Sequence, residues 1–386
     1  MIALRQLEQA VRLLEGYLRR EPLHLYLARA FKRQKRIGAR DRRLYRALLY
    51  SYFRVGGAMK GLALDEQIVA GTVVFQPPEA RPWLDKMLEH YPALAVRGHS
   101  AHERLHRVPA SWQMDWRFPY AEALSPEMSF EEMQERMLRQ PSVFIRIRHG
   151  EDTRVVQELN EQNIAYDRLD EHGAYRLPPQ VRLHDLKTFQ QGRFEIQDVH
   201  SQQSLRPFRD QFQGKWWDVC AGAGGKSLLM HHLYSGVQLW ATDLREAALG
   251  NLRQRVQRQN VPMQAVMVRD LSRQPPPPEW PQFDGLLVDA PCTGSGTWTR
   301  TPESRFYPPG KPHEKAQLQQ SILKHALPGL KTGGLLLYVT CSVYRQENEA
   351  IARWLQQEHG MALKSMQYFK THLDADVIFV AAMHKN

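Results

Sequence analysis

The second half of the chain alternates short apolar runs with longer segments of helical periodicity. Six apolar runs have the length of buried strands, at residues 216–219, 239–242, 265–268, 286–288, 335–339 and 377–382. Amphipathic patterns fit between them, for example at residues 245–259 and 313–330. This alternation predicts an α/β domain whose mainly parallel, doubly wound sheet is covered by helices. The proline run at residues 275–278 is expected to be a stiff surface loop.

A smaller pattern precedes this region. Residues 143–147 and 174–177 have the composition of strands, the second ending at Pro178 and Pro179, and residues 153–163 have the periodicity of an amphipathic helix. Together they predict a small α+β module. Pro126 breaks the pattern between residues 123 and 129, which favours a domain boundary there.

The beginning of the chain is expected to be helical. One face of the first predicted helix carries its apolar residues, namely Leu4, Leu7, Val11, Leu14 and Leu18. With 386 residues, the chain exceeds a typical domain of roughly 100 to 150. We therefore predict three domains: a helical region at 1–125, the α+β module at 126–193 and the doubly wound domain at 194–386.

The helical region turns strongly basic. A single acid, Asp41, stands among the basic residues Arg29, Lys32, Arg33, Lys35, Arg36, Arg40, Arg42, Arg43 and Arg46, and aromatic residues lie close by at Tyr45, Tyr50, Tyr52 and Phe53. Cations beside aromatic rings suit phosphate contact and base stacking. We predict nucleic-acid contacts by Arg40, Arg42 and Arg43, with a solvated helix face as the alternative. Residues 61–120 carry Trp83, Trp112 and Trp116 but no functional pattern.

The formal net charge of +11 favours a polyanionic partner, because clustered cations gain affinity by releasing phosphate counterions. A membrane surface is the competing polyanion. No stretch approaches the roughly 18 apolar residues of a spanning helix, and the first residues do not have the pattern of a secretion signal. We therefore expect a cytoplasmic protein with no membrane partner.

The three cysteines, Cys220, Cys292 and Cys341, are odd in number, so a disulfide framework is not expected. They lack the Cys-x-x-Cys and paired-histidine spacing of a structural zinc site. We expect a monomer that holds no metal. Each cysteine instead stands beside Gly, Pro or Thr at the end of an apolar run.

Chemically informative residues follow the predicted strands, where ligands of a doubly wound sheet bind. The first strand leads into the glycine-rich segment Asp218-Val219-Cys220-Ala221-Gly222-Ala223-Gly224-Gly225-Lys226-Ser227. Its glycines permit tight turns and close approach of a ligand. Asp243 follows the second strand, where it could accept hydrogen bonds from ribose hydroxyls, and Asp270 follows the third. Both could instead be helix N-caps.

Two other nucleotide-binding patterns fit the glycine-rich segment less well. The P-loop pattern G-x-x-x-x-G-K-[ST] is met at Gly225, Lys226 and Ser227 but has Cys220 at its first glycine. The dinucleotide pattern G-x-G-x-x-G lacks its last glycine. A P-loop nucleotide hydrolase remains an alternative function.

The two later cysteines lie in more specific motifs. The fourth strand leads into Asp289-Ala290-Pro291-Cys292-Thr293-Gly294-Ser295-Gly296, and the fifth into Tyr338-Val339-Thr340-Cys341-Ser342, followed by Glu347-Asn348-Glu349. With Gly192 to Asp198 upstream, these motifs resemble the Sun (Fmu) or RsmB-type family of RNA cytosine-5 methyltransferases. The resemblance covers residues 140–386. Gly222-Ala223 replaces the family's Ala-Pro, which could loosen the loop, and Val339 replaces its usual Ser.

The resemblance implies a Rossmann-like fold and S-adenosyl-L-methionine as methyl donor, bound by residues 220–226, Asp243, Asp270 and Asp289. It implies that Cys341 attacks carbon 6 of cytosine, because a thiol adduct makes carbon 5 nucleophilic. Cys292 would assist product release, and Asp289 would also hydrogen-bond the base. Lys226 could favour the thiolate and contact RNA. The target base must leave its stack.

The resemblance also implies ribosomal RNA as the partner, with the small subunit favoured and tRNA possible. A non-catalytic RNA-binding scaffold is the remaining alternative, against which the intact Cys292, Cys341 and Asp289 argue. Either later cysteine could be a buried small hydrophobe. Cys220 is expected to pack rather than react, and Glu347, Asn348 and Glu349 could simply be residues near a helix start.

Overall fold

The computed structural model describes the chain except at residues 19–20, 35, 116–117 and 180, so Lys35 and Trp116 lie outside the described residues. Two compact units are present. The helical unit comprises Met1–Glu122, Ser129–Gln140 and Trp298–Pro309, and the sheet unit comprises Ala123–Met128, Pro141–Thr297 and Gly310–Asn386. The predicted domain divisions at 125/126 and 193/194 remain predictions.

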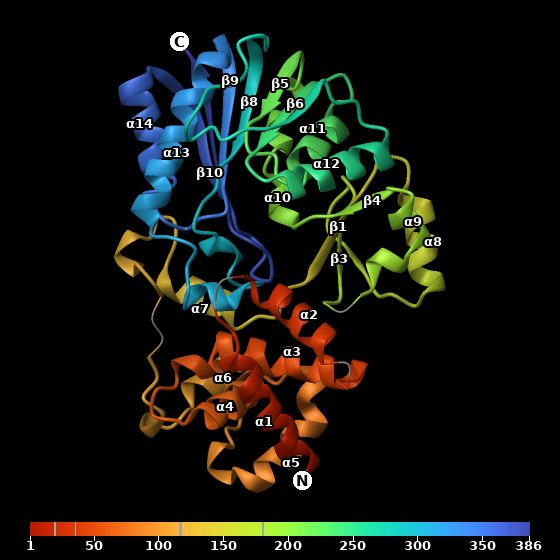
Figure 1. Ribbon diagram of the computed structural model, residues 1–386, viewed down its shortest axis with the longest axis vertical. Helices are drawn as coiled ribbons and strands as arrows, with labels where there is room; N and C mark the ends of the chain where they lie inside the picture. Colours follow the sequence, from red (N-terminus) through yellow and green to blue (C-terminus); the bar gives the residue numbers. More distant parts are fainter. Residues whose placement is uncertain (19–20, 35, 116–117, 180) are drawn as a thin grey trace. The chain divides into compact units, whose positions relative to one another are not determined.

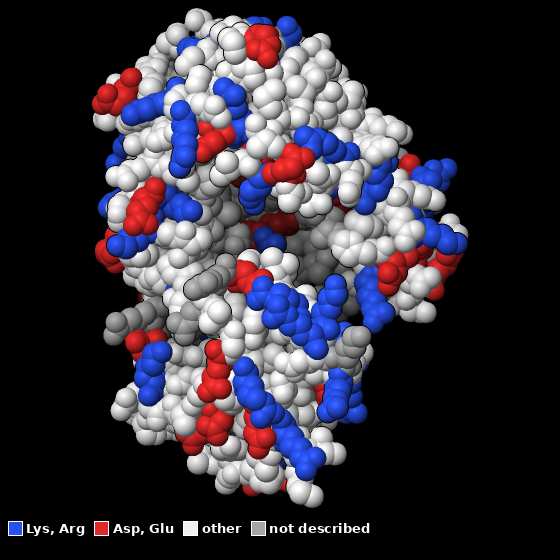
Figure 2. Space-filling view, viewed as in Figure 1, with Lys and Arg blue, Asp and Glu red and all other residues white. Residues whose placement is uncertain are grey.

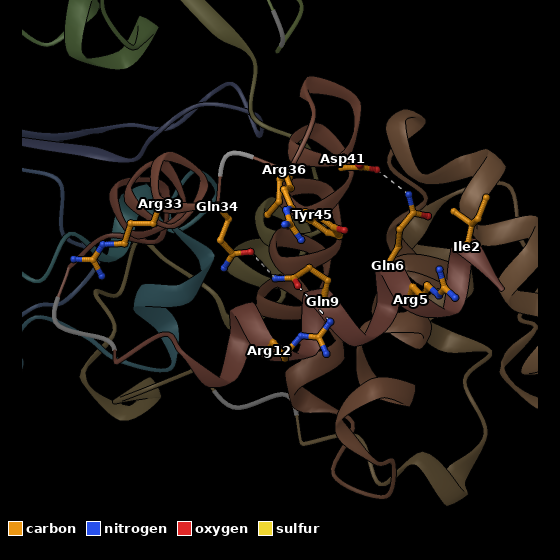
Figure 3. A pocket seen from close by; sticks show the side chains of 11 residues that line it. Ile2, Arg5, Gln6, Gln9, Arg12, Arg33, Gln34, Arg36, Asp41 and Tyr45 are labelled. Carbon is orange, nitrogen blue, oxygen red and sulfur yellow. Dashed lines mark hydrogen bonds between the residues drawn. The ribbon is translucent and has the colours of Figure 1, made fainter.

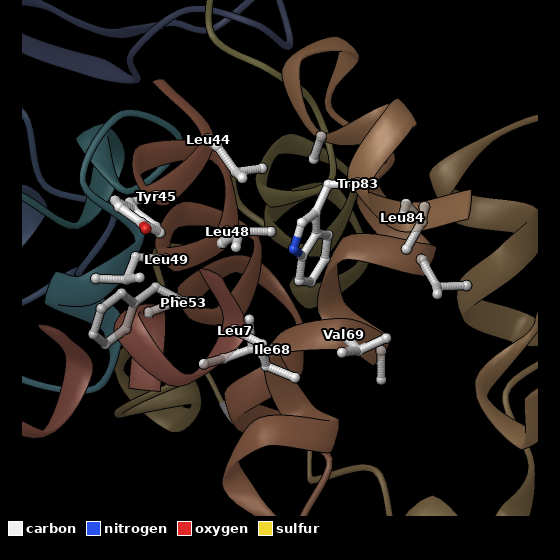
Figure 4. Close-up of a cluster of buried hydrophobic side chains, with 14 of the residues drawn as sticks. Leu7, Leu44, Tyr45, Leu48, Leu49, Phe53, Ile68, Val69, Trp83 and Leu84 are labelled. Carbon is white, nitrogen blue, oxygen red and sulfur yellow. The ribbon is translucent and has the colours of Figure 1, made fainter. Parts of the chain in front are cut away.

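The helical unit is built from helices α1 to α7 (Figure 1). Their bounds are α1 Ile2–Glu15, α2 Leu23–Arg33, α3 Ala39–Arg54, α4 Leu64–Phe75, α5 Arg81–His90, α6 Ala101–His106 and α7 Phe130–Met137. Apolar side chains from several of them converge on one core, among them Leu7, Leu48, Val69 and Trp83 (Figure 4). The Trp83 indole donates a hydrogen bond to the Ala3 carbonyl, which satisfies its buried polar group.

The buried face of α1 differs from the predicted one. Its fully buried residues are Ala3, Leu7, Ala10 and Leu13, whereas Leu18 is 71% exposed and lies beyond the helix end at Glu15. The predicted stripe counted leucine and valine and overlooked the alanines. Small side chains at positions 3 and 10 allow close helix packing, so they lie innermost and Leu4, Val11 and Leu14 flank them half-buried.

The smaller sheet of the sheet unit is antiparallel, with strand order β2-β3-β1-β4. Its elements are β1 Val143–Ile147, α8 Asp152–Glu161, β2 Asp167–Arg168, β3 Ala174–Leu177, α9 Lys187–Gln190 and β4 Phe194–Ile196. The predicted strands at 143–147 and 174–177 are confirmed, as is the helix between them. The short strand β4, just after the predicted division at 193, pairs with β1 and completes this sheet.

The larger sheet has the strand order β10-β11-β9-β8-β5-β6-β7. Its strands are β5 Lys215–Asp218, β6 Gln238–Asp243, β7 Ala265–Val268, β8 Phe283–Asp289, β9 Leu330–Thr340, β10 Met361–Phe369 and β11 Ile378–Lys385. Strands β5 to β9 are parallel, and β10 and β11 pair antiparallel at one edge. Strand order reverses between β5 and β8, which makes their carboxyl ends a ligand site.

Helices cover both faces of this sheet (Figure 1). Their bounds are α10 Val199–Gln203, α11 Gly225–Leu233, α12 Glu246–Gln259, α13 Pro312–Ala326 and α14 Glu349–His359. Trp216 faces the core beneath α11 and α12, and its neighbour Trp217 faces the core beneath α13 and α14. This alternation along β5 is that of a strand buried on both faces. The doubly wound, Rossmann-like fold class is therefore confirmed.

Two elements differ from the sequence prediction. Strand β10 went unpredicted because it is an edge strand with several exposed residues, and it lacks the continuous apolar run of a central strand. The helix predicted at 313–330 ends at Ala326, and the chain enters β9 at Leu330. Pro328 lies in the 3-10 turn between them and has no N–H to continue the α-helix.

Candidate active site

Cys292 and Cys341 meet at the carboxyl ends of the neighbouring parallel strands β8 and β9. Asp289, the last residue of β8, pairs in register with Val339 of β9, so the two cysteine motifs leave the sheet side by side. The two sulfur atoms are 3.3 Å apart, and both cysteines are free and half-buried. The structure therefore brings the two predicted thiols together.

The two thiols are not electrostatically equivalent. The hydrogen bond with Cys341, burial and the nearby Glu347 raise the pKa of Cys292 well above its ordinary value. Cys292 therefore retains its proton at neutral pH and can donate a hydrogen bond to the sulfur of Cys341. A protonated Cys292 beside Cys341 is the arrangement expected if Cys341 is the attacking thiolate.

Lys226 joins the glycine-rich loop to the first cysteine motif. Its ammonium nitrogen lies 2.7 Å from the Asp289 carboxylate, and the lysine side chain is 8% exposed. Burial opposes the charged form, but the charges of Asp289, Cys341 and Asp218 outweigh it and raise the pKa of Lys226. Lys226 is therefore a buried cation held against Asp289, where the glycine-rich loop meets the first cysteine motif.

The glycine-rich loop turns sharply between β5 and α11. Gly222 and Gly224 have φ values of +54° and +81°, in the left-handed region that favours glycine. A Cβ added to Gly224 would lie 2.0 Å from a methyl carbon of Leu252. The Ala223 carbonyl accepts a hydrogen bond from Arg255, and the Gly222 N–H donates to Asp243. The sequence Gly222-Ala223 was expected to loosen this loop, but these two hydrogen bonds hold it in place.

Cys220 and Asp218 lie at the base of this loop. Burial and the nearby acids Asp218, Asp243 and Asp289 raise the pKa of the Cys220 thiol well above its ordinary value, which fits a packing role. Burial raises the pKa of Asp218 to about 7, and Ser227 donates a hydrogen bond to its carboxylate. The sequence analysis missed this acid, although it precedes the loop directly in a motif already recognised.

Asp243 and Asp270 differ in the groups that donate hydrogen bonds to their carboxylates. Asp243 is buried at the end of β6, with one oxygen accepting from the Arg245 N–H at the start of α12 and the other from the Gly222 N–H. It links the loop to the sheet as well as forming a turn. Asp270 accepts from the Ser272 N–H and hydroxyl, and these bonds lower its pKa. The contacts of Asp270 are those of a local turn.

Glu347 is hydrogen-bonded to both cysteine motifs. Its fully buried carboxylate accepts hydrogen bonds from the Thr293 N–H and hydroxyl, from the Ser342 hydroxyl and from the Gln319 amide. Burial nevertheless raises the pKa of Glu347. Because Thr293 follows Cys292 and Ser342 follows Cys341, this carboxylate fixes the spacing of the two thiols.

Asn348 and Glu349 complete that support. The Asn348 side chain accepts from the Thr340 hydroxyl and donates to the Ser342 carbonyl, on either side of Cys341. Glu349 begins α14 and accepts from Ser125 and from the Tyr368 hydroxyl. The segment does lie at a helix start, but its buried polar contacts give it a positioning role that the sequence left open.

Gly296, the last glycine of the first cysteine motif, packs on the backbone of the second. Its N–H donates to the Cys341 carbonyl over 2.8 Å, and its own carbonyl accepts from the Val377 N–H. A Cβ at this position would lie 2.9 Å from the Cys341 carbonyl oxygen and 2.5 Å from that of Val377. The motif needs glycine here because any side chain would separate the two loops.

The residues predicted to contact nucleic acid lie on α3 of the helical unit. Arg40 and Arg43 are exposed, whereas Arg42 is partly buried and donates to the carbonyls of Phe31 and Ile37. Tyr45 and Phe53 are 5% and 1% exposed, because they belong to the core of the unit. The expectation that these two aromatic rings could stack on bases is therefore wrong.

A groove of about 770 Å³ lies nearby, between α1 and the segment joining α2 to α3 (Figure 3). Four arginines line it, namely Arg5, Arg12, Arg33 and Arg36, together with three glutamines and Asp41. Figure 2 shows Lys and Arg side chains over the part of this unit that carries α1 and α2. The sequence analysis missed Arg5 and Arg12 because they are separated from the basic run and join it only in the fold.

Two features are absent from the part of the chain that the structure describes. Within it, no group of three or more His, Cys, Asp or Glu side chains is arranged to hold a metal ion. None of its helices combines the length and apolar character needed to cross a membrane.

Part of the chain is similar in sequence to known proteins. Residues 203–379 match the family model described as 16S rRNA methyltransferase RsmB/F. Ribosomal RNA small subunit methyltransferase B of Enterobacter sp. strain 638 is 30% identical over 237 residues, covering 59% of this chain and 54% of the relative. The Escherichia coli K12 protein of the same name is 31% identical over 218 residues, covering 54% and 50%. The chain thus spans about half the length of these curated relatives.

Solved structures show a similar fold. The crystal structure of PH0851 has a TM-score of 0.71 and 20% identity, covering 99% of this chain and 98% of its own. NSun6 from Pyrococcus horikoshii, solved with SFG, has a TM-score of 0.57 and 16% identity, covering 69% and 96%. At these identities the likeness concerns the fold alone. The segment of residues 203–379, which carries both cysteine motifs, is thus similar in sequence to the RsmB/F family of methyltransferases.

Proposed function

We propose that this chain is an S-adenosylmethionine-dependent RNA methyltransferase that modifies carbon 5 of cytosine. The observation that carries the proposal is the pair of thiols, Cys292 and Cys341, 3.3 Å apart at the carboxyl end of the sheet. The ion pair between the buried Lys226 and Asp289 links them to the glycine-rich loop. That ion pair also weighs against a P-loop hydrolase, in which the lysine must bind phosphates.

The ends of β5, β6 and β8 fit the methyl donor. The tight turns at Gly222 and Gly224 allow the methyl donor to come close to the backbone. The carboxylates of Asp243 and Asp289 suit the donor's ribose hydroxyls and its positive charge. In this proposal residues 220–226, Asp243, Asp270 and Asp289 hold S-adenosylmethionine, which supplies an electrophilic methyl group when bound. Asp243 accepts from the two backbone N–H groups and from the guanidinium of Arg245, an exposed side chain whose two hydrogen bonds ribose hydroxyls would replace.

The chain's own residues account for the remaining chemistry. The Cys341 thiolate bonds to carbon 6 of cytosine, and the electron pair of the C5–C6 double bond makes carbon 5 nucleophilic. After carbon 5 is methylated and loses its proton to a base, the double bond re-forms and the bond from carbon 6 to sulfur breaks. Cys292, which retains its proton, donates a hydrogen bond to the departing sulfur. Asp289 hydrogen-bonds the edge of the base.

The RNA substrate is proposed to be ribosomal, with the small subunit favoured. The support is the name of the matched relatives, ribosomal RNA small subunit methyltransferase B. Transfer RNA is the second candidate. The basic helices, with Arg40 and Arg43 exposed, provide cations for phosphate contact.

The test is transfer of an isotope-labelled methyl group from S-adenosylmethionine to RNA, followed by mass analysis of the nucleosides. Small-subunit ribosomal RNA and bulk tRNA, each lacking 5-methylcytosine, serve as parallel substrates. The expected product is 5-methylcytidine in ribosomal RNA. Label in another nucleoside would overturn the cytosine assignment, and cofactor binding without transfer to either RNA would favour the non-catalytic scaffold.

A further inference from the structure

A second cavity lies within the sheet unit, away from the two cysteines. It encloses about 470 Å³ between the small sheet and helix α11. Its cationic and titratable lining comes from four separate segments: Arg146 of β1, His149 and His172 from turns, Arg206 and Arg209 from the 3-10 turn at Arg206–Gln211, and His232 of α11. The fold alone assembles this set, because these residues are spread over nearly ninety positions.

Arg146 is the unusual member. Its side chain is 1% exposed on the face of β1 that points away from the small sheet's own apolar core. Its Nε donates to Gln197 over 2.9 Å, but neither terminal nitrogen has a hydrogen-bond partner among the described residues. A buried guanidinium with two unused N–H ends is costly unless a ligand completes it.

The acids around the cavity are already occupied or face solvent. Glu195, opposite Arg146 on β4, accepts hydrogen bonds from Arg255, Arg258 and Gln259. Asp170 pairs with Arg206, whose other terminal nitrogen is buried and without a partner among the described residues. Of the two acids on the lining, Asp152 accepts from Tyr175 and the Glu171 side chain is 85% exposed.

The cavity therefore has an excess of positive charge that faces inward. Burial, together with Arg146, Arg148, His149 and Arg206, lowers the pKa of His232 to about 3, so this ring is neutral at neutral pH. At the rim, Gly150 has a φ of +79° and no atom within 4 Å of the position where a Cβ would stand. Guanidinium groups match tetrahedral oxyanions by paired hydrogen bonds.

We propose that this cavity binds a phosphate group, held by the free ends of Arg146 and Arg206 with Arg209 at the rim. Resting on the proposed function, we assign that phosphate to the backbone of the RNA substrate. A free phosphate compound would satisfy the same chemistry and is separated by the experiment below.

The cavity is also connected to the glycine-rich loop. Gln197 accepts from Arg146 and donates to the Gly225 carbonyl over 3.2 Å, at the first residue of α11. The next residue, Lys226, pairs with Asp289. Leu229 and His232 of the same helix line the cavity. A phosphate on Arg146 would thus fix the element that carries the loop, so RNA would help to order the methyl-donor site.

The probe is inorganic phosphate, followed by the width of its ³¹P NMR line at constant ionic strength. The unaltered protein should broaden the line. Arg146→Met, which keeps the length and apolar bulk of the buried stem, should weaken phosphate binding by about tenfold or more, as loss of a charged hydrogen bond predicts. Arg353→Ala removes an exposed arginine on α14 and should leave binding unchanged.

If Arg146→Met fails to fold, Arg209→Ala carries the test, because its side chain is 60% exposed and its removal leaves the core intact. Equal broadening by the protein and both cavity variants would overturn the phosphate site. In the sample that contains the unaltered protein, a short single-stranded RNA should sharpen the phosphate line, because the RNA displaces phosphate from the cavity. Persistent broadening would overturn the RNA assignment in favour of a free phosphate compound. None of these readouts needs methyl transfer, so failure here is distinct from failure of the proposed function.

Discussion

The sulfur of Cys292 lies 3.3 Å from that of Cys341, although the two residues are far apart in sequence and follow different strands. Thr293 and Ser342, the residues that follow the two cysteines, donate buried hydrogen bonds to Glu347, and these bonds maintain the spacing. The fold therefore fixes the contact between the two thiols, and we expect substitution of each cysteine to have a different effect.

Cys341→Ala should abolish methyl transfer, by about 10³-fold or more, because it removes the atom that bonds to carbon 6. The fold and the affinity for S-adenosylmethionine should be retained, since the glycine-rich loop is untouched. Transfer is measured with labelled donor and RNA, and donor binding by calorimetry. Turnover within tenfold of the unaltered enzyme would contradict the nucleophile assignment.

Cys292→Ala should leave attack by Cys341 possible but hinder release of the methylated base. We expect a covalent protein–RNA complex that survives a denaturing gel and needs both S-adenosylmethionine and Cys341. The double variant Cys292→Ala with Cys341→Ala is the matched control and should show no complex. Multiple turnovers by the single variant, with no trapped species, would assign Cys292 a packing role.

The stability of the sheet unit should depend on Asp218. Burial raises its pKa from 3.8 to about 7, so the folded state favours the neutral acid. The stability that the neutral Asp218 contributes to the folded state is fully present below pH 4. It is lost as the pH rises to 7, by up to about 1.4 kcal/mol per pH unit. Asp218→Asn should therefore gain stability relative to the unaltered protein over this range. Urea unfolding between pH 4 and 8 measures the difference.

The exposed Asp210→Asn variant is the control for this titration, since its side chain is 95% exposed. Its free energy of unfolding should follow that of the unaltered protein at each pH. If the free energy of unfolding of Asp218→Asn also parallels that of the unaltered protein at each pH, Asp218 is ionised in the folded protein. Other contacts then stabilise the loop.

Gly224→Ala should destabilise the sheet unit by about 1–3 kcal/mol, because the new methyl group meets Leu252 and the backbone is left-handed. Affinity for the methyl donor should fall with it. Gly250→Ala is the matched control within α12, where an added Cβ meets no atom within 4 Å. It should stabilise by about 0.5–1 kcal/mol. Equal effects in thermal unfolding would mean that the loop is not constrained at Gly224.

Arg40 and Arg43 should contribute to RNA affinity through charge alone. Replacing both with Gln should reduce the slope of log affinity against log salt by about 1.4 to 1.8, the loss of two phosphate contacts. Arg42→Gln should instead lower stability, since Arg42 holds the carbonyls of Phe31 and Ile37. Filter binding across a salt series separates the two outcomes, and an unchanged slope would make this face a solvated helix surface.

Six of the seven strands of the large sheet, their succession along the chain and the chemically informative residues that follow them could be predicted from the sequence. Apolar runs such as 216–219 report burial on both faces, and a motif such as Asp289 to Gly296 is continuous in the chain, so both can be recognised without coordinates. The edge strand β10 escaped because exposure removes that apolar signal.

Only the tertiary structure decided which side chains meet. The contact between Cys292 and Cys341 depends on the register of β8 against β9, and the role of Glu347 depends on its burial behind both loops. Arg146 resembles any strand residue in the sequence, and its unused N–H groups are visible only once four segments enclose them. Distances between residues remote in the chain follow from packing, which a local pattern does not encode.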